Sequence, residues 1–275
     1  MMNVLNEYEA DGIYTRYAYD LHPESSAFSM HVHDRCEVFF FVSGNARYLV
    51  EGTTYMPEKG SLLIMRPGEA HCPKLLGDEP YERYAVNFSA DLFDGIDPER
   101  RLMKPFMERQ LGKCNHYSLP QAEVLFNEMC REYEDDYERR ISVVAGLFSI
   151  LHAVNGMYSA LKDKDPVLVT IEERLLAYVN AHLFDDLSVP AIARHFFLST
   201  SQIRRLFKKA SGASPWEYIT AKRLTAARER IAGGESAGKA AERCGFRDYS
   251  TFYRAYVKRF GNSPIGDGSG RPQCH

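Results

Sequence analysis

Two histidines and a glutamate stand close together near the amino end of this 275-residue chain, in the order His31-x-His33-x3-Glu37. Side chains two positions apart on a β-strand point to the same face, so His31 and His33 would act together. Imidazole combined with carboxylate suits a divalent Zn, Fe, Mn, Ni or Cu ion. The spacing therefore predicts that these side chains share one site on a strand face. That site could bind a metal ion or a small molecule, or the side chains could simply pack against their neighbours.

A second group of chemically useful side chains lies between Gly245 and Pro264. Asp248 is a typical helix N-cap, Gly261 suits a helix end, and Pro264 cannot extend a helix. A helix with a packed back and a basic front suits the major groove of DNA, although the pattern alone equally fits a solvated amphipathic helix. The back is formed by Phe252, Ala255, Tyr256 and Phe260, and the front by Tyr249, Ser250, Tyr253, Arg254 and Lys258, with Thr251 at the edge.

The elements that would position the histidines are short strands between residues 13 and 90, separated by turn residues. Many short strands at close spacing are typical of a β-barrel or jelly roll. Four further side chains are expected to face its interior, namely Arg16, Tyr48, Arg66 and Tyr84. The predicted strands are Ile13–Tyr19, Phe28–Val32, Glu37–Val42, Ala46–Val50, Ser61–Met65 and Arg83–Phe88.

Residues 98–161 change to helical periodicity, which predicts helices over Pro98–Gln110, Pro120–Arg139 and Ile141–Leu161. The third carries a continuous apolar stripe that includes Leu147 and Leu151. These helices could simply cover the barrel, or the stripe could lie partly against a second subunit. A charged linker ending in proline is expected at 162–166.

The region after the linker predicts a series of capped helices. Ser188 would cap a helix with Pro190 in its first turn, and Ser199 would cap the helix Thr200–Ala210. Ser214 would cap a longer helix that runs to about Ala232, anchored in part by Trp216. The helices capped by Ser188 and Ser199 form a first helix-turn-helix unit, in which Thr200, Ser201, Arg204, Arg205 and Lys208 face outward. Ser236 would cap a later helix that ends at Cys244.

Charge divides the chain into an acidic front and a basic back. Residues 1–165 hold 17 Lys and Arg and 27 Asp and Glu, whereas residues 166–275 hold 17 and 10. A net charge of +7 on the back half is expected where one domain meets DNA. The acidic, polar start is unlike a signal peptide, no apolar run resembles a membrane span, and six scattered cysteines without a CxxC pair favour free thiols in the cytoplasm.

Residues Val167 to Pro264 resemble the AraC/XylS family of transcription activators. The matching signature residues are Gly245, Phe246, Asp248, Ser250, Phe252, Arg254, Gly261 and Pro264. Tyr256 stands where the family has phenylalanine, and residues after Pro264 lack the family's closing helix, so a disordered tail is expected at 265–275. The resemblance implies a double helix-turn-helix domain that binds double-stranded operator DNA. It places base contacts at Ser201, Arg204, Arg205, Tyr249, Ser250, Tyr253 and Arg254, and phosphate contacts at Thr200, Thr251 and Lys258.

The front half resembles the two cupin motifs, with His31, His33 and Glu37 in the first and His71 in an imperfect second. In metal-binding cupins these four residues hold one divalent ion, which could here be Zn, Ni, Mn or Fe. In AraC-type sensor domains the same pattern often lies where an organic effector binds. The resemblance therefore implies an effector site at Arg16, His31, His33, Glu37, Tyr48, Arg66, His71 and Tyr84, and no cofactor is certain.

Together these observations predict a multidomain α+β protein. Its parts are a cupin-like β-barrel with flanking helices over 1–95, a helical dimerisation region over 96–162, and an all-α DNA-binding domain with two helix-turn-helix units over 167–264. We expect a cytoplasmic, dimeric transcription regulator, controlled by a small molecule such as a sugar and acting on the transcription machinery, with no membrane partner. The alternative is a cupin metal-dependent enzyme or metal sensor fused to a DNA-binding module, but no further catalytic group favours an enzyme.

Overall fold

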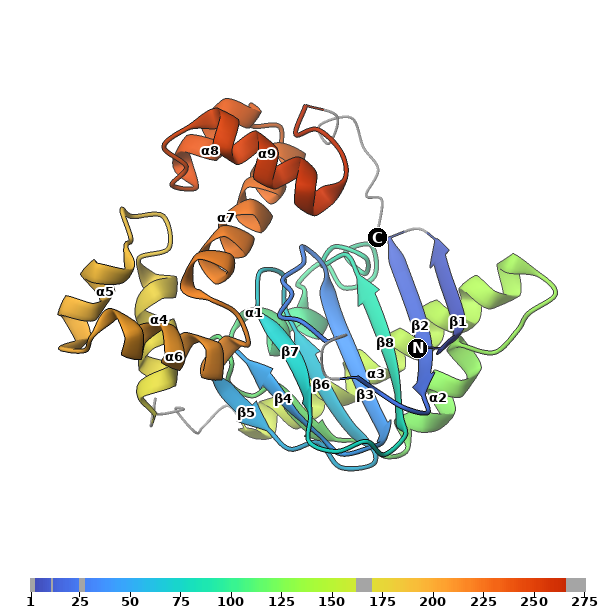
Figure 1. Cartoon of the computed structure of the whole chain (residues 1–275). Helices are drawn as coiled ribbons and strands as arrows, with labels where there is room; N and C mark the ends of the chain where they lie inside the picture. The colour runs from blue at the N-terminus through green and yellow to red at the C-terminus, as the bar shows by residue number, and fades with distance from the viewer. Residues whose placement is uncertain (1–2, 11, 25–27, 162–169, 266–275) are drawn as a thin grey trace. The chain divides into compact units, whose positions relative to one another are not determined.

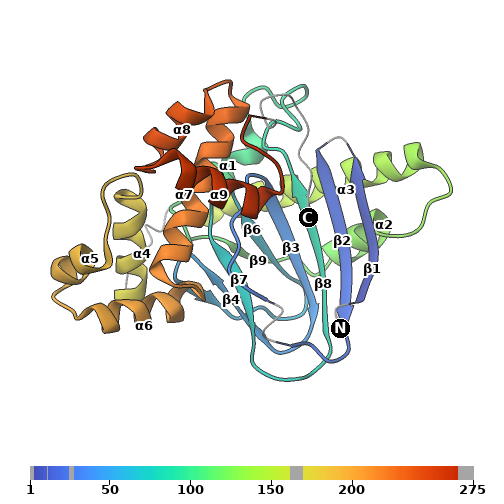
Figure 2. The ribbon, with the colours of Figure 1, turned by 45° about the horizontal axis from the view of Figure 1, so that its top comes forward.

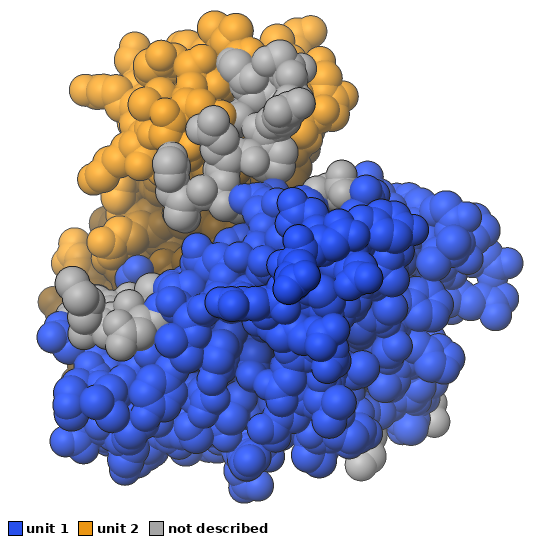
Figure 3. Space-filling view, turned by 90° about the vertical axis from the view of Figure 1, so that its right-hand side faces the viewer, with its two compact units in different colours: residues 1–29, 35–67, 72–167 blue, residues 30–34, 68–71, 168–275 orange. Residues whose placement is uncertain are grey.

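The computed structural model describes residues 3–10, 12–24, 28–161 and 170–265 (Figure 1). The chain forms two compact units (Figure 3). Unit 1 comprises residues 1–29, 35–67 and 72–167, and unit 2 comprises residues 30–34, 68–71 and 168–275. The linker predicted at 162–166 and the tail predicted at 265–275, apart from Ile265, lie outside the described residues.

Unit 1 contains two antiparallel sheets. The six-stranded sheet has the order β1-β2-β8-β3-β6-β9, and the three-stranded sheet has the order β5-β4-β7. This agrees with the predicted β-rich amino-terminal domain. The strands are β1 (Asn3–Ala10), β2 (Ile13–Asp20), β3 (Cys36–Ser43), β4 (Ala46–Val50), β5 (Thr53–Tyr55), β6 (Ser61–Met65), β7 (His71–Leu75), β8 (Tyr81–Phe88) and β9 (His116–Ser118).

The two faces of the six-stranded sheet have different partners. Phe39 on β3 lies opposite Ala85 on β8 and Leu63 on β6, and this face packs with Tyr48 of β4 in the other sheet. Alternate side chains such as Phe40 point the other way and pack with helices. Because side chains alternate along a strand, the register decides which residues can line the space between the sheets.

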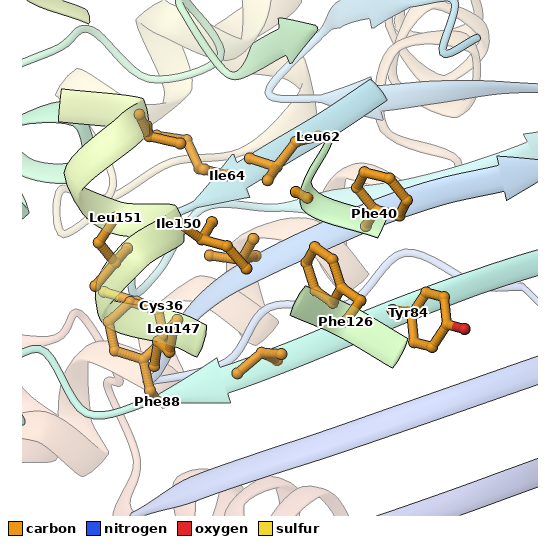
Figure 4. Packing of buried hydrophobic residues seen from close by; sticks show 14 of the residues in the cluster. Cys36, Phe40, Leu62, Ile64, Tyr84, Phe88, Phe126, Leu147, Ile150 and Leu151 are labelled. Carbon is orange, nitrogen blue, oxygen red and sulfur yellow. The ribbon is translucent and has the colours of Figure 1, made fainter. Parts of the chain in front are cut away.

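Helices cover the outer face of the six-stranded sheet. Leu147, Ile150 and Leu151 of α3 pack onto Ile64 and Phe88 of the sheet, as Figure 4 shows. These side chains are fully buried, so they form the core of unit 1 rather than a subunit interface. The prediction that Leu147 and Leu151 meet a second subunit is therefore wrong. The helical elements are a 3-10 helix (Arg101–Met103), α1 (Lys104–Met107), α2 (Ala122–Met129) and α3 (Asp136–Leu161).

Several predicted boundaries differ from the structure. Phe28–Val32 is not a strand, and only His31 forms a bridge there, to His71. The helix expected over Pro98–Gln110 shrinks to two short turns, and Pro120–Arg139 is interrupted between α2 and α3. Strand β9 falls within 96–162, where only helices were expected, because its three residues pair with the edge of β6.

Helix α3 is long and apolar enough over Asp136–Ala160 to cross a membrane, judged by length and composition alone. This differs from the expectation that no stretch resembles a membrane span. A core helix of a globular domain has the same composition, and the inner side of α3 packs into the core of unit 1.

Unit 2 is helical from residue 170 onward, as predicted for the carboxy-terminal domain. Helix α7 runs between the group α4 to α6 and the group α8 and α9 (Figures 1 and 2). Ser188, Ser199, Ser214 and Asp248 each accept a backbone N–H in the first turn of the following helix, which confirms four predicted caps. Ser236 precedes α8 as expected, but its side chain forms no cap hydrogen bond, so that predicted cap is wrong. The helices are α4 (Ile171–Ala181), α5 (Val189–Phe196), α6 (Thr200–Ser211), α7 (Pro215–Ala232), α8 (Ala237–Arg243) and α9 (Tyr249–Phe260).

Each helix-turn-helix unit has its own apolar core. Ile203 and Phe207 of α6 pack with α4 and α7 in the first, and Phe252 and Tyr256 of α9 pack with α7 and α8 in the second. Trp216 was expected to anchor α7, but its side chain is 64 % exposed, so that expectation is wrong. The periodicity of α7 does not decide whether Trp216 is buried or exposed, because α7 contributes apolar side chains to the cores of both helix-turn-helix units.

Candidate functional sites

The four cupin-motif residues come together at one place. The ligand atoms of His31, His33, Glu37 and His71 all lie within 4.8 Å of one another. The ring centroids of His31 and His71 are 4.1 Å apart, and those of His33 and His71 are 5.0 Å apart. His31 and His71 also exchange backbone hydrogen bonds, because each donates its N–H to the carbonyl of the other. This bridge joins two segments that are 40 positions apart in the sequence.

The surroundings of the cluster orient its ligands. His71 is buried, and its Nδ1 lies 2.7 Å from the carbonyl oxygen of Glu69. A carbonyl only accepts, so Nδ1 carries the proton and the Nε2 lone pair is left to accept or to bind a metal. Asn87 donates from Nδ2 to Glu37 Oε2 at 3.2 Å, which holds that carboxylate in turn. A metal-binding histidine and carboxylate are commonly held by outer contacts of this kind.

A four-coordinate zinc ion needs its ligand atoms about 3.3 Å apart, given bonds of about 2.0–2.1 Å. The separations within the cluster reach somewhat beyond this, so small rotations of the side chains would suffice. Three imidazoles with one carboxylate also match the preferences of divalent first-row metals. The residues present therefore fit a metal ion.

Polar groups also face the space between the two sheets. Arg83 on β8 donates from Nη1 to Asp20 Oδ2 at 2.5 Å, and its guanidinium lies 4.4 Å from the centre of the Tyr81 ring. Tyr81 is fully buried, yet among the residues that the structure describes no group hydrogen-bonds its hydroxyl. Tyr48 packs against Phe39 there, and burial raises the pKa of its phenol well above the usual value. A buried hydroxyl without a partner is unfavourable and suits contact with a ligand.

Two residues predicted to face this space do not. Tyr84 points to the opposite face, stacks on Tyr17 with ring centroids 4.5 Å apart, and donates to Asn127 Oδ1 at 2.5 Å. Arg66 reaches toward the 104–109 segment, where Nη1 donates to the carbonyls of Met107 and Arg109 at 3.2 Å. Both predictions are therefore corrected, because the register of β8 places odd-numbered residues on the inner face and Arg66 lies just beyond β6.

Arg16 lies on β2 opposite Ala85, on the same face of the sheet as Phe39. Its Nε is 3.4 Å from Glu7 Oε1 on the neighbouring strand β1, and the two side chains keep 28 % and 48 % exposure. Arg16 therefore lies on the predicted face of the sheet, where it forms an ion pair with Glu7 of the edge strand β1. Tyr81 and Arg83 were missed by sequence reasoning. Val86 and Phe88 belong to the helix-facing core, so the alternation of side chains along β8 could have shown that Tyr81 and Arg83 face the other sheet.

Helix α6 exposes a polar, basic front over an apolar back. Ser201, Arg204, Arg205 and Lys208 are exposed, while Thr200 is half-buried. Gln202 is exposed too, but its Oε1 accepts from the N–H of Ser199 as part of a capping box. The capping box occupies the Gln202 side chain, whereas Arg204, Arg205 and Lys208 are directed outward.

Helix α9 has the same design. All six predicted contact residues on it are exposed: Tyr249, Ser250, Thr251, Tyr253, Arg254 and Lys258. The Thr251 hydroxyl donates to Asp248 Oδ2 at 2.7 Å, and the same carboxylate accepts the Thr251 N–H. Thr251 therefore strengthens the cap, and these hydrogen bonds lower the pKa of Asp248. Phe197, in the turn before α6, was missed by sequence reasoning and is almost fully exposed.

Two protein-family models match this architecture. Residues 14–151 match the model of the AraC-like ligand binding domain, and residues 192–266 match that of a helix-turn-helix domain. The chain is 25 % identical over 249 residues to the HTH-type transcriptional activator RhaS of Escherichia coli, covering 89 % of this chain and 88 % of that protein. Among solved structures, ToxT of Vibrio cholerae O395 is similar over 93 % of this chain and 96 % of its own, with 15 % identity and a TM-score of 0.39. The carboxy-terminal domain of AraT from Geobacillus stearothermophilus is 25 % identical over 40 % of this chain and 92 % of its own, with a TM-score of 0.36.

Proposed function

This chain belongs to the family of AraC-like transcription regulators, and from that premise we propose that α6 and α9 read operator DNA under the control of an effector bound by the sheet domain. The observation that carries the DNA part is the shared design of the two helices. Each buries an apolar back and exposes a front that contains arginine, lysine and hydroxyl groups and no acidic residue. Such a front complements phosphates and base edges in a major groove.

The test is selection of duplexes from a random pool by the purified full chain, followed by footprinting. Major-groove segments on one face of B-DNA repeat about every 10 base pairs. We expect each subunit to protect two short blocks separated by about one turn. A single continuous block would contradict the assignment of α6 and α9 as two reading helices.

We infer that an organic effector binds between the two sheets, beside Tyr48, Tyr81 and Arg83. The unpartnered Tyr81 hydroxyl and the Arg83–Asp20 pair suit a ligand rich in hydroxyl groups, such as a sugar, and Tyr48 offers a ring face. A panel of sugars screened by thermal shift tests this, because a ligand of the native state raises the melting temperature. A hit should lose most of its shift in Tyr81→Phe and keep it in Tyr84→Phe, whose ring lies on the other face.

The cluster of His31, His33, Glu37 and His71 favours a second candidate function, in which a divalent metal takes part in sensing. When bound, an ion that accepts more than these four protein ligands would keep a coordination position open for an effector. We expect chelator-treated full chain to bind one zinc ion in calorimetry, and His71→Ala to abolish binding. His22→Ala, which changes an exposed histidine outside the cluster, serves as the control. Equal zinc binding by both variants would show that the cluster is not the zinc site.

Pairing of two subunits through the outer face of α3 completes the proposal. Ile141 and Phe148 are 52 % and 36 % exposed, and Ala145 and His152 lie on the same side. These positions alternate by four, three and four residues, which is the spacing of a helix-pairing seam. A dimer would present four reading helices to a repeated operator and regulate the transcription machinery in the cytoplasm. The relatives are transcription regulators, and we propose no enzymatic step.

A further inference from the structure

Phe197, the residue that ends α5, has an unusual conformation for an aromatic side chain. Its φ is 54° and ψ is 38°, in the left-handed region that glycine adopts most easily. Its side chain is nevertheless 95 % exposed, and it forms no ring contact with any residue that the structure describes. Glycine would relieve the backbone at this turn and lose no internal packing. The phenyl ring is therefore available for a partner outside the chain.

The turn that carries Phe197 borders a shallow hollow on the first helix-turn-helix unit. Its apolar lining comes from Pro190, Ala193, Phe197 and Leu198, and its polar lining from Arg194, Ser199 and Thr200. Pro190 lies in the first turn of α5 and Thr200 begins α6. The hollow thus lies beside the amino-terminal end of the reading helix, which in a helix-turn-helix unit is the end that contacts base edges.

Charge around the hollow identifies the partner as nucleic acid. Residues 187–216 contain the basic side chains Arg194, Arg204, Arg205, Lys208 and Lys209 and no aspartate or glutamate, and of these Lys209 pairs with Glu172 of α4 at 2.5 Å. A surface on which basic side chains predominate attracts phosphates before any specific contact forms. An apolar hollow on such a surface needs an apolar group from the DNA. In the major groove that group is the C5-methyl of thymine.

We propose that Phe197 is a specificity-determining residue that, with the apolar walls of the hollow, receives a thymine methyl at the edge of the block read by α6. This rests on the proposed function of α6 in DNA reading. The strained turn positions the ring, and no covalent step is involved. The contact is apolar, so it would add selectivity without changing the number of phosphates neutralised.

Deoxyuridine tests the proposal because it differs from thymidine only by that methyl. Each thymine of a duplex selected by the wild-type chain is replaced singly by deoxyuridine, and affinity is measured by fluorescence anisotropy. We expect about a fourfold loss at one position in the α6 block, the value for burying one methyl group. Phe197→Gly and Phe197→Asn should lose this discrimination, whereas Phe197→Leu, which stays apolar, should retain part of it. Trp216→Ala removes another exposed aromatic of the same domain and should leave the discrimination intact.

Thermal unfolding separates this effect from misfolding. Glycine and asparagine tolerate the left-handed region, so Phe197→Gly and Phe197→Asn should melt at or above the wild-type temperature. Their salt dependence of binding should equal that of the wild type. Equal binding of thymine and uracil duplexes by the wild type at every position, or a selected α6 block without thymine, would overturn the proposal. A wild-type chain that selects no duplex would instead contradict the proposed function itself.

Discussion

Arg223, in the middle of α7, donates from Nη1 to the carbonyl oxygen of Gly245 at 2.8 Å and fills the space that a side chain at Gly245 would need. Its Nε and Nη2 donate to the carbonyls of Leu183 and Asp185 at 2.8 and 2.7 Å. One buried guanidinium therefore joins the loop after α4 to the turn that precedes α9. Because those segments lead into the first and second helix-turn-helix units, the residue sets how the units are placed within the domain.

Arg223→Lys should destabilise the protein, because an ammonium on a flexible stem cannot match the planar fork that meets three carbonyls. Leaving buried carbonyls without donors costs about 1–3 kcal/mol in the free energy of unfolding. Urea unfolding of the full chain measures the loss. Arg204→Lys, at an exposed position on α6, should leave that free energy within experimental error, and equal losses in the two variants would contradict this role of Arg223.

Gly245→Ala should be destabilising for a different reason. The residue has a φ of +80°, and an added Cβ would lie 2.9 Å from Arg223 Cζ and from the carbonyl oxygen of Phe184. Gly238 offers a control, since a Cβ there would meet no atom within 4 Å. We expect Gly245→Ala to lower the melting temperature and Gly238→Ala to leave it unchanged or raised, because alanine is a better helix former than glycine in the first turn of α8.

The proposed pairing of two subunits through Ile141, Ala145, Phe148 and His152 of α3 can be tested by substitution. Ile141→Glu and Ala145→Glu should give monomers in light scattering coupled to size exclusion, with near-normal melting temperatures, because both side chains are exposed. Leu147→Glu should instead unfold unit 1, since it places a charge in the core. A dimer that persists in both surface variants would show that another face pairs the subunits.

The arginines of the two reading helices should affect different base pairs. Arg204→Ala or Arg205→Ala should relax preference within one protected block, and removing a bidentate arginine–base pair should cost about 1–3 kcal/mol of discrimination. Arg254→Ala should act on the other block. Lys258→Ala should weaken binding to all sequences alike and reduce the salt slope by about one. Uniform loss for every sequence in all three arginine variants would mean that these residues contact only the backbone.

His116 should make the stability of unit 1 depend on pH. Burial lowers its pKa, and its Nε2 lies 2.8 Å from Ser61 Oγ at the edge of β6. The unfolded chain then binds a proton more readily than the fold, so stability is full above the unfolded pKa of about 6.5 and falls as pH drops through the lower folded value. His116→Gln should flatten this fall in urea unfolding between pH 7.5 and 5.5, and an unchanged slope would assign it to other groups.

Residue types and spacing along the sequence were sufficient for much of this protein. Helix caps at Ser199, Ser214 and Asp248 follow from side chains that bond their own first turn, so local sequence determines them. The exposed fronts of α6 and α9 follow from periodicity of the same local kind. That Tyr81 and not Tyr84 faces the space between the sheets depends instead on the register of β8 between β2 and β3, and this register is set by strands distant in the sequence. Likewise, only packing decided that Leu147 is core while Ile141 is surface, because both are apolar residues of one helix and the sequence does not state which face meets the sheet.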